Sequence, residues 1–394
     1  MASLESVDRM FSQAVESKTM PGIVAVAATD QGEIYQGAFG KRELGKEASM
    51  TIDTVMWIAS MTKAITATAA MQLVEQGKLG LDRPAQDVVP DLASARVLEG
   101  FDAAGKPRLR APRRPITLRH LLTHTAGFSY EIWNPAVARY QTATNTPGIT
   151  TCTNAALTTP LMFDPGDRWE YGINMDWAGK MVEAVSGAPL DRYFQQHILG
   201  PLGMTDTSFR ISPSQRARLA KVHQRGEDGA LAPIEFEIPQ APEFCMGGGG
   251  LYGTATDYLT FARMILHGGT FKGARVLRAE TVDLMAENHI GALEVGVMKT
   301  AIPALSNDVE LFPGITKKWG LSFLINTQPA STGRMAGSLA WAGLANTYFW
   351  IDRTMRLCGV FLSQVFPFYD RTAIDLFSRF ETEVYRAVSV RAAA

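Results

Sequence analysis

The chain has 394 residues, a length that allows two or three domains with a large buried core. Its composition, 46% hydrophobic and 20% charged residues, is ordinary for a globular protein in water. The 38 basic and 39 acidic residues give a formal net charge of −1, which offers no electrostatic reason to expect a nucleic acid or an anionic membrane as partner. We therefore expect neither of these partners, and a small neutral molecule fits the composition better.

The N-terminus and the cysteines exclude further classes of protein. The first residues contain neither a basic stretch nor a continuous apolar one, so the sequence predicts no secretory signal and no transmembrane span, and indicates a cytoplasmic protein. The three cysteines, Cys152, Cys245 and Cys358, lie far apart without a C-x-x-C pattern, which argues against a disulfide framework or a zinc site. The six histidines form no H-E-x-x-H pattern. We expect neither a metal nor another cofactor.

The first forty residues predict a helix packed on a β-hairpin. Apolar residues recur at helical spacing over 4–15, and a turn follows at 20–22. The apolar run 23–28 predicts a buried strand, 30–32 a hairpin turn, and 33–38 its partner strand.

A serine and a lysine stand three residues apart at the start of the next predicted helix. The run 63–76 is rich in helix formers, and Gly77 lies where a C-terminal glycine is expected. Residues three apart on a helix share one face, with Cβ atoms about 5–6 Å apart, so the Lys63 amine can reach the Ser60 hydroxyl. A serine nucleophile needs such a neighbouring base. A capping serine followed by a solvated lysine is the alternative interpretation.

The middle of the chain predicts short helices between loops. Thr117 is typical of a residue that caps a short helix over 118–123, and 128–170 is rich in loops and scattered aromatic residues. These aromatics could wall a pocket or pack between helices. Another helix begins after Tyr171 and ends near Gly187, so that a tyrosine precedes a helix.

Four consecutive glycines, 247–250, do not predict a phosphate-binding loop. Neither G-x-x-x-x-G-K-[ST] nor G-x-G-x-x-G is present, and Thr254 with Asp257 predicts the cap of a helix over 258–267. We expect the glycines to let the backbone run close beside Ser60.

From Trp319 onward the pattern changes to strands that alternate with turns rich in Gly, Asn and Asp. This spacing predicts an antiparallel meander, and apolar residues on one face of 370–385 predict a terminal helix that covers it. The predicted strands are 320–325, 338–343, 347–351 and 357–365.

The two ends of the chain thus supply a sheet and its flanking helices, whereas the middle is mostly helix and loop. We predict an α+β fold in which 1–70 and 310–394 form one domain with an antiparallel sheet, joined by part of 180–260. Residues 71–309 form a mainly helical insertion in this prediction.

Three motifs occur in an order that resembles the serine β-lactamase and penicillin-binding-protein superfamily. They are Ser60-Met61-Thr62-Lys63, then Tyr171, then Trp341-Ala342-Gly343 on a late strand. The chain is most similar to the class C branch and to the family VIII carboxylesterases, in which W-[AG]-G replaces K-T-G. The similarity extends to the lovastatin-type acyltransferases through 97–102, 116–125 and 171–179.

The resemblance implies a serine β-lactamase-like fold and a site. It makes Ser60 the nucleophile, with Lys63 and Tyr171 as one coupled acid–base pair. The backbone N–H groups of Ser60 and Leu344 would bind the oxyanion. The other substrate-binding residues that the resemblance implies are Asn174, Trp341, Ala342 and Gly343.

Two departures from the family pattern affect the substrate. The lactam-recognising branch has Y-x-N, but Ile173 occupies the place of the asparagine, which comes one residue later at Asn174. The cationic head of K-T-G is replaced by Trp341. Both changes disfavour an anionic β-lactam and favour a neutral ester beside an aromatic wall.

The leading hypothesis is a carboxylesterase that hydrolyses short acyl esters through an acyl-Ser60 intermediate, with weak β-lactamase activity allowed. The alternative enzyme is an acyltransferase that moves a small acyl group from a thioester to a hydroxylated acceptor. A sensor that β-lactams acylate and that turns over slowly is a third possibility. No G-x-S-x-G elbow is present, and His124, the one histidine that suits a triad, is interpreted as structural.

Overall fold

The computed structural model describes residues 4–393. Its centre is a seven-stranded sheet in the order β11-β12-β13-β14-β15-β1-β2, in which every neighbouring pair is antiparallel. The strands of this sheet are β1 (Gly22–Thr29), β2 (Glu33–Gly40), β11 (Lys317–Trp319), β12 (Leu324–Asn326), β13 (Leu339–Gly343), β14 (Thr347–Asp352) and β15 (Leu357–Leu362).

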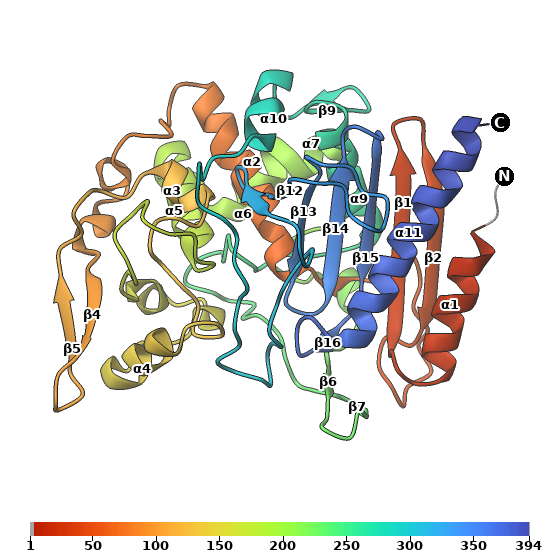
Figure 1. Cartoon of the computed structure of the whole chain (residues 1–394), viewed down its shortest axis with the longest axis horizontal. Coiled ribbons are helices and arrows are strands. Elements are labelled where there is room, and N and C mark those ends of the chain that lie inside the picture. The colour runs from red at the N-terminus through yellow and green to blue at the C-terminus, as the bar shows by residue number, and fades with distance from the viewer. Residues whose placement is uncertain (1–3, 394) are drawn as a thin grey trace.

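Helices and small sheets surround this central sheet (Figure 1). The helices are α1 (Glu5–Glu16), α2 (Thr62–Glu75), α3 (Leu118–Leu122), α4 (Pro135–Thr144), α5 (Asn174–Ser186), α6 (Leu190–Phe194), α7 (Gly200–Leu202), α8 (Pro213–Arg216), α9 (Ala255–Leu266), α10 (Ala279–Ala286) and α11 (Arg371–Ala393). The small sheets pair β3 (Met56–Trp57) with β8 (Tyr252–Gly253), β4 (Val97–Phe101) with β5 (Pro107–Arg110), β9 (Thr270–Phe271) with β10 (Ala274–Arg275), and β6 (His223–Arg225) with both β7 (Leu231–Pro233) and β16 (Val365–Phe366).

The two ends of the chain meet in the central sheet, where Val26 of β1 pairs with Val360 of β15. This arrangement confirms the predicted fold class, an antiparallel sheet flanked by helices. The division into domains stays a prediction, and α9, which lies within the predicted insertion, packs on the central sheet through Tyr258, whose ring lies 5.0 Å from that of Phe349.

Opposite faces of the sheet are covered by different helices (Figure 1). On one face, Phe11 of α1 has its ring centroid 5.8 Å from Phe361 of β15 and 5.8 Å from Phe380 of α11. On the other face lies α9. Because the side chains of a strand alternate between faces, both faces of β14 and β15 are apolar and buried.

Two predicted strands are partly wrong. Residues 320–323 turn instead of extending, because the Gly320 N–H donates to the Phe323 carbonyl and the Leu321 N–H donates to Met285. The last strand stops at Leu362, and the following β16 pairs with β6 outside the central sheet.

The helical part of the molecule contains elements that were predicted as loop. α4 lies within the predicted loop 128–170 and starts at an Asn-Pro pair, where the Asn134 side chain accepts a hydrogen bond from the Ala136 N–H at 2.9 Å. Asparagine at the N-cap and proline at the first helical position both favour a helix start, so the prediction overlooked a local signal. The hairpin of β4 and β5 has no counterpart among the predicted strands.

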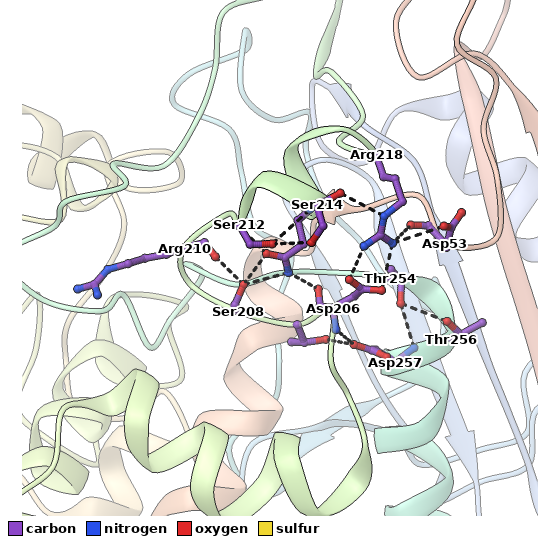
Figure 2. A network of polar contacts seen from close by, with 12 residues as sticks. Asp53, Asp206, Ser208, Arg210, Ser212, Ser214, Arg218, Thr254, Thr256 and Asp257 are labelled. Carbon is purple, nitrogen blue, oxygen red and sulfur yellow. Dashed lines mark hydrogen bonds and ion pairs between the residues drawn. The ribbon is translucent and has the colours of Figure 1, made fainter.

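A polar network fixes the loop after α7 to the start of α9 (Figure 2). The Thr254 hydroxyl accepts from the Asp257 N–H at 3.2 Å, which confirms the predicted cap, although the helix starts at Ala255. The Asp257 carboxylate accepts from Asp206 N and from Thr207 Oγ1, both at 2.9 Å. Burial raises the pKa of Asp257 to about 6.

Within residues 4–393, no helix combines the length and the apolar character that crossing a bilayer requires. The same residues contain no group of three or more His, Cys, Asp and Glu side chains arranged to hold a metal ion.

Candidate active site

Ser60 lies in a short 3-10 turn, Ala59–Met61, that leads directly into α2. α9 supports this turn, since the Tyr258 hydroxyl donates to the Met61 carbonyl at 2.9 Å. α2 is buried over almost its whole length and packs on α5, and the turn before it packs on β13 of the central sheet. Ser60 itself remains partly exposed. The nucleophile candidate therefore stands at the edge of the packed core, on a rigid support.

The Lys63 amine is 1% exposed and contacts three oxygens. It lies 3.1 Å from Ser60 Oγ, 3.1 Å from the Tyr130 hydroxyl and 2.5 Å from the Gly248 carbonyl. Burial penalises the charged ammonium and lowers the pKa of Lys63 to about 7, against the opposing attraction of Asp176. A lysine that gives up its proton near neutral pH can act as a base toward Ser60.

Tyr171 completes the predicted group of three. Its hydroxyl accepts from Trp341 Nε1 at 2.9 Å. The Lys63 amine lies 4.7 Å from the centre of the Tyr171 ring. Burial raises the pKa of Tyr171, so this phenol keeps its proton under conditions in which Lys63 loses one. The structure thus brings Ser60, Lys63 and Tyr171 together.

Aromatic rings enclose the tyrosine. Trp341 of β13 has its ring centroid 4.9 Å from Tyr171 and 4.7 Å from Trp319. Trp133 and Tyr130 approach Tyr171 at 5.4 and 5.2 Å. The predicted aromatic wall is present, and its rings cover the side of the site on which the lysine lies.

The strand end that carries the second predicted oxyanion donor lies beside the Ser60 turn. A Cβ added at Gly343 would overlap the Ile58 carbonyl oxygen and approach Ala59 Cβ to 3.1 Å. Ala342, the residue before it, is buried and pairs with Tyr348 in the sheet. Gly343 therefore contacts the segment that precedes Ser60, and Leu344 is the next residue along the chain. The role of Leu344 N–H in binding an oxyanion stays a prediction.

Asn174 and His124 lie behind the tyrosine. Both are fully buried, and Asn174 Nδ2 lies 3.0 Å from His124 Nδ1 and 3.4 Å from the Phe128 carbonyl. The His124 ring packs 4.7 Å from that of Tyr171, and burial lowers the pKa of His124 well below its usual value. This placement supports the structural interpretation of His124. It does not favour the predicted contact of Asn174 with a substrate, because the amide is enclosed by protein.

The glycine run lies beside the Ser60 turn, as the sequence predicted. Besides the contact of Gly248 with Lys63, the Gly249 carbonyl accepts from Trp57 Nε1 at 2.7 Å and the Gly247 carbonyl from Thr66 Oγ1 at 2.7 Å. On this side, the pocket that holds Lys63 is therefore lined by the backbone of the glycine run rather than by side chains.

Sequence reasoning missed two residues around Lys63. Tyr130 was one of several scattered aromatics, and no local pattern distinguished it from its neighbours. Asp176 lies in the buried first turn of α5, 1% exposed, and its Oδ1 accepts from the Gly248 N–H at 2.8 Å. A carboxylate among the apolar residues 173–178 was an available signal, because buried aspartates are rare unless they have a partner.

Comparison with known proteins gives a consistent result. The family model described as Beta-lactamase matches residues 7–382. The chain is 33% identical over 399 residues to monacolin J acid methylbutanoyltransferase of Aspergillus terreus, covering 96% of this chain and 95% of that protein. It is 32% identical over 402 residues to lovastatin esterase of Penicillium rubens, covering 97% of this chain and 98% of that protein.

Solved structures agree with these matches. A variant of simvastatin synthase from Aspergillus terreus superposes with a TM-score of 0.86 at 32% identity, over 98% of this chain and 97% of that one. EstCE1, described as a hydrolase with promiscuous acyltransferase activity, has a TM-score of 0.77 at 23% identity, over 97% and 98% of the two chains, and supports the fold alone. Both acyl transfer and ester hydrolysis are named among these similar proteins.

Proposed function

This chain belongs to the Beta-lactamase family, and we propose that it is a serine acyltransferase that moves a small acyl group from an ester or thioester donor to a hydroxylated acceptor. From the sequence alone, hydrolysis is the leading reaction and transfer is the alternative. The full-length relatives named as methylbutanoyltransferases favour transfer, and they suggest an acyl group of about methylbutanoyl size.

The observation that carries the proposal is the contact between the Lys63 amine and Ser60 Oγ at 3.1 Å. A serine hydroxyl is a weak nucleophile at neutral pH until a base accepts its proton. Lys63, with a pKa lowered to about 7 by burial, can be neutral at that pH and accept it. No metal is needed for this step.

In the acylation half-reaction, Ser60 Oγ bonds to the donor carbonyl carbon while its proton passes to the Lys63 amine. The oxyanion that forms would be bound by the N–H groups of Ser60 and Leu344, and losing one such donor typically costs about 2.7–4 kcal/mol of transition-state stabilisation. The bond to the donor oxygen or sulfur then breaks. The leaving group takes a proton from the Lys63–Tyr171 pair, and the acyl group remains on Ser60.

Deacylation reverses these steps with a new hydroxyl group. The acceptor hydroxyl gives its proton to the same pair and attacks the acyl carbon, and Ser60 Oγ leaves with its proton restored. The aromatic wall of Trp341, Trp319 and Tyr171 supports transfer over hydrolysis, because it limits the access of water to the basic side of the site.

Hydrolysis is the second candidate function. It is favoured by the partial exposure of Ser60, which leaves its acyl group within reach of water, and by the similarity to lovastatin esterase. In both reactions the acyl-Ser60 intermediate is the same, so they differ only in what attacks it.

A partition assay tests the proposal. The protein is incubated with a methylbutanoyl thioester and an excess of a hydroxylated acceptor, and the acylated acceptor and the free acid are quantified over time. The proposal expects acylated acceptor as the main product and none from Ser60→Ala. Free acid as the main product over a range of acceptors would support the esterase instead, and product formation by Ser60→Ala would exclude an acyl-Ser60 mechanism.

A further inference from the structure

Asp176 is a buried carboxylate for which the proposed mechanism has no use. Its Oδ1 accepts from the Gly248 N–H at 2.8 Å. Its Oδ2 is also enclosed, and within the described part of the chain it has no hydrogen-bond partner. An unsatisfied buried carboxylate oxygen costs free energy, so its presence requires a compensating role.

One peptide group connects this carboxylate to the candidate base. The Gly248 N–H donates to Asp176, and the Gly248 carbonyl accepts from the Lys63 amine at 2.5 Å. A Cβ added at position 248 would lie 2.6 Å from Asp176 Oδ2. The carboxylate can therefore approach this closely because the residue is glycine.

We propose that Asp176 is a positioning residue of the acyl-transfer site, which orients the Lys63 amine through the Gly248 peptide and supplies the negative charge against which Lys63 gains and loses its proton. The inference rests on the proposed function, because it assigns Asp176 a part in the step in which Ser60 loses its proton. Asp176 does not touch the reacting atoms, and it acts through Gly248 and through its electric field.

The other titratable groups around Lys63 supply no comparable charge. Tyr130, from the loop after α3, and Tyr171, from the segment before α5, both have a pKa that burial raises, so both phenols are neutral. His124 has a pKa that burial lowers, so its ring is neutral as well. Glu131, next to Tyr130, is only partly buried, and its charge is not among those that act on Lys63. Asp176 is the group whose charge opposes the effect of burial on Lys63.

A purely structural role for Asp176 makes a different prediction. Holding the Gly248 N–H requires only an acceptor oxygen, which an asparagine also has. Only the charged role predicts a change in the protonation of Lys63 when Asp176 becomes neutral. An anion beside the amine stabilises the ammonium form, so removing the anion lowers the pKa of Lys63.

The test is the pH dependence of Ser60 acylation, followed as the burst of p-nitrophenol from p-nitrophenyl acetate between about pH 5 and about pH 9. In the parent protein the burst rate rises with pH as Lys63 loses its proton. In Asp176→Asn we expect this rise to move to lower pH by about one unit or more. We expect the plateau rate to fall as well, because an amine of lower pKa is a weaker base.

Two further variants make the result decisive. Asp257→Asn neutralises another carboxylate whose pKa burial raises, in the network of Figure 2, and should leave the midpoint of the pH profile unchanged. Gly248→Ala retains the charge of Asp176 but forces its carboxylate away, so its midpoint should move in the same direction as that of Asp176→Asn, by a smaller amount.

The possible results separate the two proposals. A folded Asp176→Asn protein with an unchanged midpoint, or the same shift in Asp257→Asn, overturns the assignment of Asp176. If Asp176→Asn does not fold, Gly248→Ala is used in its place, and an unchanged midpoint of its pH profile overturns the assignment of Asp176. Release of p-nitrophenol that persists at the parent rate in Ser60→Ala, or that is missing altogether from the parent protein, is instead a failure of the proposed function.

Discussion

The pair Lys63 and Asp176 and the pair Arg218 and Asp206 each place a cation near a carboxylate, but they differ in solvent access and in contact. Lys63 and Asp176 are each 1% exposed and are separated by the Gly248 peptide. Arg218 and Asp206 touch through two hydrogen bonds, of 2.5 and 3.0 Å, with side chains that are 21% and 27% exposed (Figure 2).

The consequence for protonation is opposite in the two pairs. Direct hydrogen bonding to Asp206 raises the pKa of Arg218, so this charge is fixed at every accessible pH. Burial instead lowers the pKa of Lys63 to about 7 and raises that of Asp176 to about 6. Because burial shifts the pKa values of Lys63 and Asp176 toward each other, the two groups titrate as a coupled pair. A buried pair in indirect contact, such as Lys63 and Asp176, can therefore change its protonation during a reaction. A directly bonded pair near the surface, such as Arg218 and Asp206, keeps its charges and contributes to stability instead.

The largest expected effect follows from removing the proposed nucleophile, Ser60, beside the buried pair. Ser60→Ala should lower the rate of acyl transfer by about 10⁴-fold or more, because no group is left to carry the acyl chain. Initial rates with the thioester donor measure this loss. The thermal midpoint should change little because Ser60 is only partly buried, and near-normal rates in a folded variant would refute the assignment.

A smaller loss is expected at Tyr171, whose ring lies against the Lys63 amine. Tyr171→Phe should reduce kcat by about 10²–10⁴-fold, since it removes the phenol that shares proton transfer with Lys63. It also leaves Trp341 Nε1 without its acceptor. Single-turnover acylation measures the loss, and Tyr252→Phe, which alters a buried tyrosine that accepts from the Ile238 N–H, serves as the matched control. Equal losses in both variants would show a general effect on packing.

The pH dependence of the parent protein probes the lysine directly. Only the neutral amine can accept the Ser60 proton, so the acylation rate should rise about tenfold per pH unit below about 7 and level off above it, following the pKa of Lys63. Stopped-flow measurement of the p-nitrophenol burst gives the midpoint. A rate that stays constant from about pH 5 to about pH 8 would contradict the role of Lys63 as base.

The smallest effect on activity is expected in the surface network. Arg218→Ala should lower the free energy of unfolding by about 1 kcal/mol or less, since the pair is partly solvated, and should leave kcat unchanged. Urea denaturation and initial rates measure the two quantities. If Arg218→Ala loses activity while its stability is retained, the surface network is coupled to the buried pair Lys63 and Asp176. The two regions would then not differ in the way described above.

Local patterns predicted much of the fold. The helical spacing near the N-terminus, the apolar run 23–28 and the glycine-separated strands 338–351 are local signals that burial in the sheet reinforces, and the structure has an element at each place. Residues 320–323 failed as a strand because their backbone partners include Met285, which is distant in sequence. No local pattern contains that information.

The candidate site also contains some residues that sequence patterns predict and others that only the tertiary fold brings to it. The spacing of Ser60 and Lys63 follows from helix geometry, and Tyr171 followed from the order of motifs. Tyr130 and Gly248 reach Lys63 only through the tertiary fold, from 67 and 185 positions away along the chain. Asn174 was assigned from its neighbourhood in a motif, and the turn that begins α5 directs it toward His124 instead.

The pairing of β13 with β14 also determines when the surroundings of Ser60 are completed during synthesis of the chain. The segment that carries Ser60 leaves the ribosome before Gly343, which packs against Ile58 and belongs to a hairpin that is synthesised later. Until that hairpin closes, the Ser60 turn lacks one wall. A nascent chain that stops short of this hairpin therefore carries Ser60 without the contact that Gly343 makes with the turn before it.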